Sequence, residues 1–129
     1  MGTIVNWYPR RVGRVLVVTR HRVRDVDADA FIAGAGAALE VLATRPGWVD
    51  GTLGRNVDDP ELWVLSTRWR DVGSYRRALS AYEVRIVAVP LLSTAVDEPS
   101  AYEVVLGEGG DGTSSHARDA ATGGPGAGQ

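Results

Sequence analysis

Residues 61–90 read ELWVLSTRWRDVGSYRRALSAYEVRIVAVP, and this stretch decides the fold because a strand pattern gives way to a helix pattern within it. In residues 62–69, alternate positions would face opposite sides of a strand. One side holds Trp63, Leu65, Thr67 and Trp69. The other side also begins with apolar residues, so both faces become polar only toward the end of the segment. This pattern predicts a strand that is covered on both sides near its start.

The second half of the stretch has the period of a helix. Asp71 can cap the first turn by accepting hydrogen bonds from free N–H groups, and Ser74 is a weaker capping candidate. The apolar positions then step by three and four residues along one stripe, which consists of Val72, Tyr75, Leu79, Tyr82, Ile86 and Val89. We therefore predict one continuous helix that buries this stripe and is ended by Pro90.

The remainder of the chain supplies three more strands and one more helix. The expected elements are a strand at 14–24, a helix that begins at Asp27 or Asp29 and runs to about residue 44, a hairpin of strands at 48–56 and 62–69, the helix at 71–90, and a strand at 101–106. Gly51 and Gly54 lie inside the second strand and suggest either a bulge or the close approach of another group to the backbone.

The order of these elements is βαββαβ. It predicts an α+β, ferredoxin-like fold in which both helices cover one face of a four-stranded antiparallel sheet. The other face needs cover as well, because the first strand is apolar on both of its sides. We therefore predict a homodimer through the open sheet face, which makes a dimeric α/β barrel. The domain is expected at 14–106, with an N-terminal arm at 1–13 and a disordered, Gly-rich tail at 107–129.

Composition narrows the classes of partner. All 14 basic residues are Arg, and the tail accounts for one Arg and three acidic residues, which leaves 13 of each elsewhere. This balance predicts no nucleic-acid partner. Cys is absent, which rules out disulfides and thiolate sites and best fits a cytoplasmic protein. No apolar run reaches the ~18 residues of a membrane span, so we expect a soluble protein with no membrane partner.

Two motifs carry a resemblance to a known family. They are RPGW at 45–48 after the first helix and LSTRWRD at 65–71, the latter followed by Tyr75 and Leu79. In this order and spacing they resemble the antibiotic biosynthesis monooxygenase domain of the dimeric α/β-barrel superfamily. The resemblance implies a homodimer whose cavity between sheet and helices oxidises quinols or polyketide anthrones with O2, without flavin, metal or haem. It also implies that the substrate's own carbanion reduces O2, while the protein supplies desolvation, a proton acceptor and hydrogen bonds to the phenolate.

Some positions depart from the pattern of that family. Many relatives place a His one turn into the second helix, where this chain has Ala78. Haem-degrading proteins of similar fold need a His farther along this helix and an Asn in the first strand, and an approximate alignment puts Val87 and Thr19 there. We therefore do not expect haem cleavage. Ala78 favours an alternative function, that of a non-catalytic dimeric α/β-barrel protein that binds a small molecule or is associated with stress.

The remaining polar and aromatic residues provide the candidate site. The catalytic candidates are His21, Tyr75 and Tyr82, and the substrate-binding candidates are Thr19 and Trp69. His21 could accept a proton near neutral pH, a Tyr hydroxyl could orient a substrate oxygen, and Trp69 could stack on an aromatic substrate. We expect both Tyr to project from the buried face of the helix. The alternative is that both Tyr and Trp69 are core residues and that His21 is an ordinary strand residue. No cofactor and no metal ligand set is predicted.

Overall fold

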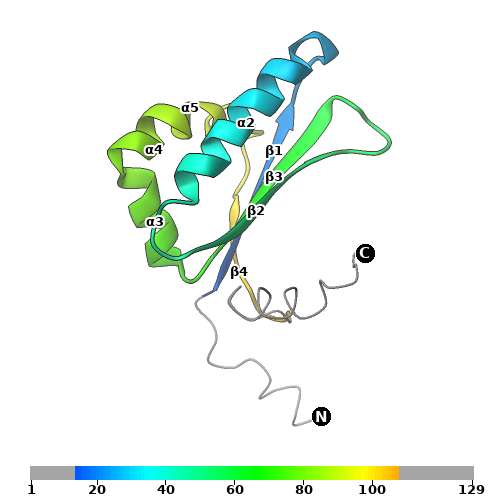
Figure 1. Ribbon diagram of the computed structural model, residues 1–129. Coiled ribbons are helices and arrows are strands. Elements are labelled where there is room, and N and C mark those ends of the chain that lie inside the picture. Colours follow the sequence, from blue (N-terminus) through cyan, green and yellow to red (C-terminus); the bar gives the residue numbers. More distant parts are fainter. Residues whose placement is uncertain (1–13, 108–129) are drawn as a thin grey trace, which may run out of the picture.

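The computed structural model describes residues 14–107 of the chain (Figure 1). They form a four-stranded antiparallel sheet with the strand order β2-β3-β1-β4. The elements are, in chain order, β1 (Val15–Arg22), the 3-10 helix η2 (Asp25–Asp27), α2 (Ala28–Leu42), β2 (Trp48–Arg55), β3 (Leu62–Trp69), α3 (Val72–Ser80), α4 (Tyr82–Val87), α5 (Val89–Leu92) and β4 (Ala101–Glu103). The predicted ferredoxin-like fold is thereby confirmed. The predicted arm at 1–13 lies outside the described residues, as does the predicted tail at 107–129 apart from its first residue.

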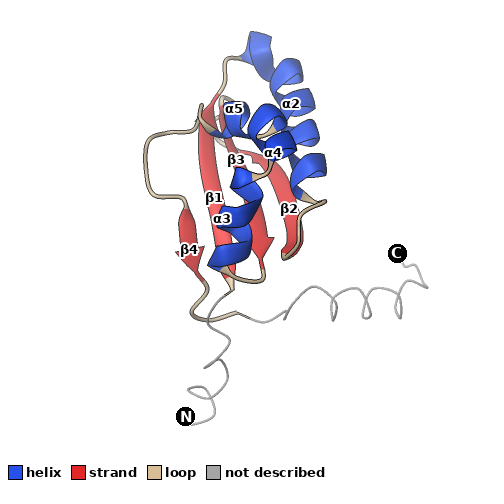
Figure 2. Ribbon diagram, turned by 90° about the vertical axis from the view of Figure 1, so that its left-hand side faces the viewer, coloured by secondary structure: helices blue, strands red, loops and turns tan. Residues whose placement is uncertain are grey.

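The helices of the described chain lie on one face of the sheet (Figures 1 and 2), which we call the inner face. β1 and β3 form its centre and pair along their whole length, from Val15 opposite Trp69 to Arg22 opposite Leu62. Every second residue of both strands is buried on this face. α2 covers it with small buried residues and with Leu42, whose burial contributes about 1.5–3 kcal/mol.

The start of α3 is fixed by a cap and by a close backbone approach. The side chain of Asp71 accepts a hydrogen bond from the Ser74 backbone N–H at 2.7 Å, which confirms the predicted N-cap. Ser74 is itself buried against Gly47, whose φ is 91°. A Cβ at Gly47 would lie 2.3 Å from the Ser74 side chain, so only glycine fits here.

The prediction of a single helix over residues 71–90 is wrong, because the chain forms three shorter helices there. Ala81, with ψ at 140°, is extended and separates α3 from α4. The break changes the helical phase, so that Val84 and Ala88 are buried while Ile86 is 58% exposed. Pro90 lies at the start of α5, where its missing N–H removes no helical hydrogen bond, so it begins a helix rather than ending one.

Gly51 of β2 meets a crowded part of the inner face. A Cβ there would lie 2.6 Å from the Trp48 ring and 2.7 Å from Leu39, which supports the close-approach interpretation for this glycine. The irregularity in the β2–β3 pairing lies between Trp48 and Asp50, one position before the glycine.

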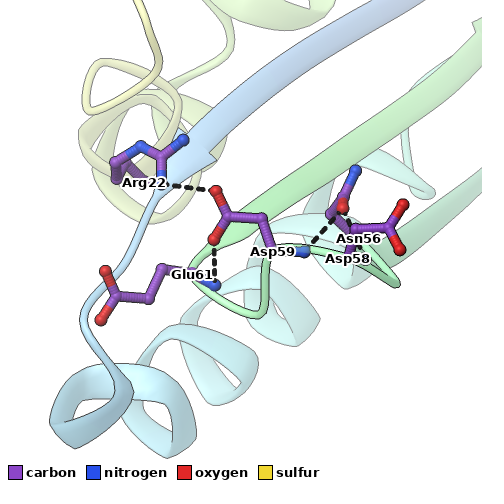
Figure 3. Close-up of polar contacts among 5 residues, drawn as sticks. All are labelled: Arg22, Asn56, Asp58, Asp59 and Glu61. Carbon is purple, nitrogen blue, oxygen red and sulfur yellow. Dashed lines mark hydrogen bonds and ion pairs between the residues drawn. The ribbon is translucent and has the colours of Figure 1, made fainter.

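The turn between β2 and β3 is tied to the end of β1 (Figure 3). The Asn56 side chain accepts hydrogen bonds from the backbone N–H groups of Asp58 and Asp59, both at 2.8 Å. Asp59 in turn accepts from the Glu61 backbone N–H at 3.1 Å and pairs with Arg22 at 2.9 Å. These contacts fix the hairpin against the sheet centre.

No helix of the described residues covers the second face of the sheet, which we call the open face (Figure 2). Its half-buried apolar residues on β1 and β3 are Leu16, Val18 and Val64, which stand opposite Arg68, Ser66 and Arg20, and we call these three residues its apolar centre. Its margin is charged, because three Arg of these strands each pair with a carboxylate: Arg20 with Glu98, Arg22 with Asp59, and Arg68 with Asp50.

Candidate active site

A cavity of about 310 Å³ opens at the edge of β1, where β4 is too short to accompany it. β4 pairs only with residues 15–17, and the connection at 93–100 takes its place beyond them. The Val18 N–H donates to the Ser100 carbonyl and the Val96 N–H donates to the Arg20 carbonyl, both at 2.8 Å. The cavity therefore lies between a rigid strand and a connection that is fastened to it at two points.

The lining of this cavity contains apolar, hydroxyl and carboxylate side chains. β1 contributes Val18 and Thr19, and α5 with the residue after it contributes Leu92 and Ser93. The polar residues of the connection in the lining are Asp97, Glu98 and Ser100. The Arg20 guanidinium donates to both Glu98 carboxylate oxygens at 2.8 Å, and these hydrogen bonds hold the pKa of Glu98 below its usual value. Thr19, Ser93 and Ser100 place hydroxyl oxygens in the lining, and the Ser93 hydroxyl donates to the Pro90 carbonyl at 2.9 Å.

Thr19 connects this cavity to a buried histidine. Thr19 and His21 are two residues apart on β1, so both side chains lie on the inner face. The Thr19 Oγ1 lies 2.9 Å from the His21 Nε2, and the other ring nitrogen, Nδ1, lies 3.1 Å from the Thr94 Oγ1. His21 is only 1% exposed, so it is a buried strand residue, and both of its ring nitrogens have hydrogen-bond partners.

The surroundings of His21 favour its neutral form. Its ring packs against Phe31 at a centroid distance of 5.2 Å. Burial lowers the pKa of His21 from its ordinary value of 6.5, because the charged imidazolium loses its hydration. A neutral imidazole is present at neutral pH, which is the form that can accept a proton.

Tyr75 lies behind the wall of the cavity. It is half-buried on α3, and burial raises the pKa of its hydroxyl, while a hydrogen bond with Ser100 opposes that change. Because Ser100 lines the cavity, the Tyr75 hydroxyl reaches the site through one intervening residue. It remains a neutral hydrogen-bonding group at physiological pH.

Trp69 belongs to the aromatic end of the inner face. It is fully buried, makes edge contacts with Trp48 and tilted contacts with Tyr75, and its Nε1 donates to the Thr67 hydroxyl at 2.8 Å. Trp69 borders a second cavity of about 160 Å³ at the sheet end, together with Leu16 and other residues. The two cavities have no lining residue in common, so the structure does not bring Trp69 together with Thr19.

Tyr82 does not project from a buried helix face, and that expectation is wrong. It is the first residue of α4 and is 75% exposed. The extended backbone of Ala81 turns it outward, because the helical phase that would have buried it ends at Ser80. Tyr82 lines neither of these two cavities.

Residues 93–100 supply groups that the sequence pattern did not single out. Thr94 contacts the His21 ring, and Ser100 links the cavity to Tyr75. The segment has neither the period of a helix nor that of a strand, so its sequence predicts only a connection. Thr94 and Ser100 gain importance only from the position of this segment beside β1.

The described residues hold no group of three or more His, Cys, Asp or Glu side chains that could bind a metal ion. Across residues 14–107, helices are too short or too polar to cross a membrane.

Comparison with known proteins shows which family the chain belongs to. The profile of the family described as antibiotic biosynthesis monooxygenase matches residues 14–85, which is more than half of the chain. The chain belongs to the antibiotic biosynthesis monooxygenase family. Among curated protein sequences no significant match is found.

Solved structures of similar fold include members of this monooxygenase family. SnoaB, a cofactor-independent oxygenase from Streptomyces nogalater, is 25% identical, has a TM-score of 0.61, and matches over 75% of this chain and 96% of its own. A conserved protein from Methanosarcina mazei Go1 is 20% identical with a TM-score of 0.60, over 74% of this chain and 96% of its own. A protein from Chloroflexus aurantiacus J-10-fl, named as a candidate antibiotic biosynthesis monooxygenase, is 20% identical with a TM-score of 0.59, over 74% and 97%. The last two comparisons bear on the fold alone.

Within this monooxygenase fold, Ala78 has a purely structural environment. It is 1% exposed and packs in the core with Trp69 and Val84. The chain therefore has core packing where the family resemblance led us to look for a His, and the buried imidazole of the described residues is on β1 instead.

Proposed function

We propose that the protein is a cofactor-independent monooxygenase that oxidises an aromatic quinol- or anthrone-like small molecule with O2. The proposal is carried by one observation, the buried Thr19–His21 pair beside a cavity in a chain of this family. SnoaB, which is named a cofactor-independent oxygenase, supports the same class of reaction. The cavity volume of about 310 Å³ is near the lower end of ligand pockets, about 300–1,000 Å³, and suits a small aromatic molecule.

The reaction begins with a proton transfer. For an anthrone, an acidic C–H proton passes to His21 by way of the Thr19 hydroxyl, and the substrate becomes a carbanion. The carbanion is oxidised by O2, which is reduced as a C–O bond forms, and the resulting peroxide takes the proton back from His21. The carbon then loses its remaining proton as the O–O bond breaks and water leaves, so that the CH2 group becomes a ketone and one oxygen atom of O2 enters the product.

Other residues of the site hold the substrate. The Ser100 hydroxyl can hydrogen-bond to a substrate oxygen, and Tyr75 orients Ser100 from behind. The Ser93 hydroxyl donates to the Pro90 carbonyl at 2.9 Å, so it can only accept a hydrogen bond from a substrate hydroxyl. Trp69 lies too deep in the core to meet a substrate in this cavity, so we assign it to packing. Tyr82 receives no role in the reaction.

We further propose that the functional unit is a homodimer through the open face. That face has an apolar centre at Leu16, Val18 and Val64 and a margin of ion pairs, which is the general arrangement of a protein interface with a dry core and a polar rim. A second copy would cover the apolar centre with an identical surface across a two-fold axis.

The test of the reaction is O2 uptake by chelator-treated protein with a panel of anthrones and hydroquinones. We expect substrate-dependent uptake above autoxidation and, with 18O2, one labelled oxygen atom in the ketone product. Thr19→Val and His21→Gln should each reduce the rate by about 100-fold or more, because each interrupts the proton transfer.

Thr67→Val is the matched control for Thr19→Val. Thr67 is also a buried threonine of the inner face, and its hydroxyl is bonded to Trp69 rather than to the cavity. This variant should lose stability but keep the rate per folded molecule. An absence of O2 uptake with every substrate would overturn the proposal, and retained ligand binding by the same protein would then support the non-catalytic alternative.

A further inference from the structure

His21 has two possible neutral forms, and only one of them can accept a proton from the cavity. Each ring nitrogen lies within hydrogen-bond distance of a threonine hydroxyl, Nε2 with Thr19 and Nδ1 with Thr94. A hydroxyl can donate or accept, so these two contacts alone do not determine which nitrogen carries the hydrogen. A third contact of the same chain removes the ambiguity.

Thr94 is committed as an acceptor toward His21. Its Oγ1 lies 2.7 Å from the Leu91 carbonyl oxygen, which can only accept, so the hydroxyl hydrogen of Thr94 is used in that bond. The Thr94 oxygen then has only lone pairs to offer to Nδ1. A stable contact at 3.1 Å therefore requires a hydrogen on Nδ1 and leaves Nε2 with its lone pair.

This arrangement sets the direction of the bond to Thr19. With a lone pair on Nε2, the Thr19 hydroxyl donates to it at 2.9 Å, in preference to the Leu65 carbonyl oxygen at 3.4 Å. The lone pairs of the Thr19 oxygen then remain for a hydrogen donor in the cavity that Thr19 lines. A substrate proton can move to Thr19 while the Thr19 proton moves to Nε2, and the product is an imidazolium whose Nδ1–H is still held by Thr94.

The opposite form would stop this transfer. If the hydrogen were on Nε2, it would be donated to Thr19, and Thr19 would donate to Leu65. His21 would then have its lone pair on Nδ1, away from the cavity. The Thr94 hydroxyl would have to leave Leu91 to satisfy it.

We propose that Thr94 is a positioning residue that fixes His21 in the Nδ1–H form and so directs its basic nitrogen, Nε2, toward Thr19 and the cavity. The inference rests on the proposed function for its consequence in the reaction, but the tautomer can be measured without any substrate. Thr94 stands just after α5, outside the cavity lining, and does not touch the substrate space.

The experiment is 15N NMR of the full chain labelled at histidine, in a His116→Gln background, so that His21 is the only imidazole. At a pH where the ring is neutral, we expect the two ring nitrogens to report the Nδ1–H form. Thr94→Val removes the acceptor, and the signals should shift to the Nε2–H form or to a mixture. Thr94→Ser keeps the hydroxyl and should keep the Nδ1–H form.

Thr19→Val is the second variant, because it removes the other partner of the ring. If Thr94 sets the tautomer, Thr19→Val retains the Nδ1–H form; if Thr19 sets it, this variant and not Thr94→Val changes the signals and overturns the proposal. An Nε2–H ring in the unsubstituted background would overturn it as well.

Activity gives the remaining readout. Thr94→Val should lower the rate of substrate-dependent O2 uptake by about tenfold or more, and Thr94→Ser should restore it. If the tautomer behaves as described but no substrate is oxidised, the positioning role stands and the proposed function fails. If the Thr94→Val tautomer is unchanged, the positioning role fails whatever the activity.

Discussion

Along the central strands β1 and β3, the polar side chains of the inner face are buried and uncharged, whereas those of the open face include three arginines that pair with carboxylates. Thr19, His21 and Thr67 have nearly no contact with solvent, and each has a hydrogen-bond partner on the same face. On the open face, Arg20 and Arg22 reach carboxylates at the margin of the sheet.

The difference follows from the cost of removing a group from water. A buried hydroxyl or neutral imidazole needs only a hydrogen-bond partner, whereas a buried charge loses far more hydration energy. The inner face can therefore hold chemistry that depends on a neutral base, and the open face can hold charges only where water still reaches them. The apolar centre of the open face is half-buried in the single chain, and a partner would remove it from water.

The largest expected effect is the loss of Trp69 from the inner face. Trp69→Ala removes a fully buried indole and leaves the Thr67 hydroxyl without its donor, so the free energy of unfolding should fall by about 3–5 kcal/mol. Urea unfolding followed by far-ultraviolet circular dichroism measures the change. Trp69→Phe should lose clearly less, and a loss below about 1 kcal/mol for Trp69→Ala would contradict its place in the core.

A substitution on the open face should weaken the association of two chains rather than the folding of one. Val64→Asp introduces a charge into the half-buried apolar centre and should raise the dimer dissociation constant by at least about 100-fold, roughly 3 kcal/mol. Sedimentation velocity over a range of concentrations measures this constant, with circular dichroism to check the fold.

Val57→Asp is the matched control for that experiment. Val57 is 95% exposed at the tip of the β2–β3 hairpin, away from the centre of the face, so the same substitution there should leave association unchanged. A monomeric parent protein at all concentrations would contradict the dimer outright.

The sequence predicted the inner face better than the second helical region. The alternation of apolar residues predicted the bounds of β3 at 62–69 correctly, because successive side chains of a strand point to opposite faces of the sheet. The helix pattern failed at Ala81, since an alanine has no side-chain feature that marks an extended residue. The stripe through Tyr82 and Ile86 was a regular pattern on a helix that does not continue.

The candidate site was predictable only in part. His21 and Thr19 were named as candidates from the sequence, and strand spacing puts both side chains on one face, where they are hydrogen-bonded at 2.9 Å. The contact of His21 with Thr94 joins residues 73 positions apart and depends on where the connection crosses β1. No local pattern contains that information, since the connection has no period of its own.

A smaller effect is expected in the pH dependence of stability, because the inner face buries a histidine. Burial holds the pKa of His21 below that of the unfolded chain, so the unfolded state takes up a proton first as the pH falls. The contribution of His21 to stability is thus complete above its unfolded pKa of 6.5 and is lost progressively as the pH drops toward the folded pKa. Urea midpoints from pH 8 to pH 5 should decline less in His21→Gln than in the parent. His116→Gln, which keeps His21, should retain the parental slope, and equal slopes for all three would contradict the assignment.

The smallest effect is expected from a charge at the margin of the open face, the Asp59 carboxylate beside Arg22 (Figure 3). Asp59→Asn removes the negative charge but keeps an oxygen that can accept the Glu61 N–H, so the turn retains that hydrogen bond. The urea midpoint should therefore change only slightly at low salt, and the difference should vanish in about 1 M salt, where the screening length is ~3 Å.

Asn56→Ala is the contrasting variant, because it deletes the acceptor of two backbone N–H groups, and salt cannot replace those bonds. If Asp59→Asn were instead as damaging as Asn56→Ala at every salt concentration, the charge would matter to the fold itself, and the distinction between a dry inner face and a solvated margin would fail at this point of the sheet.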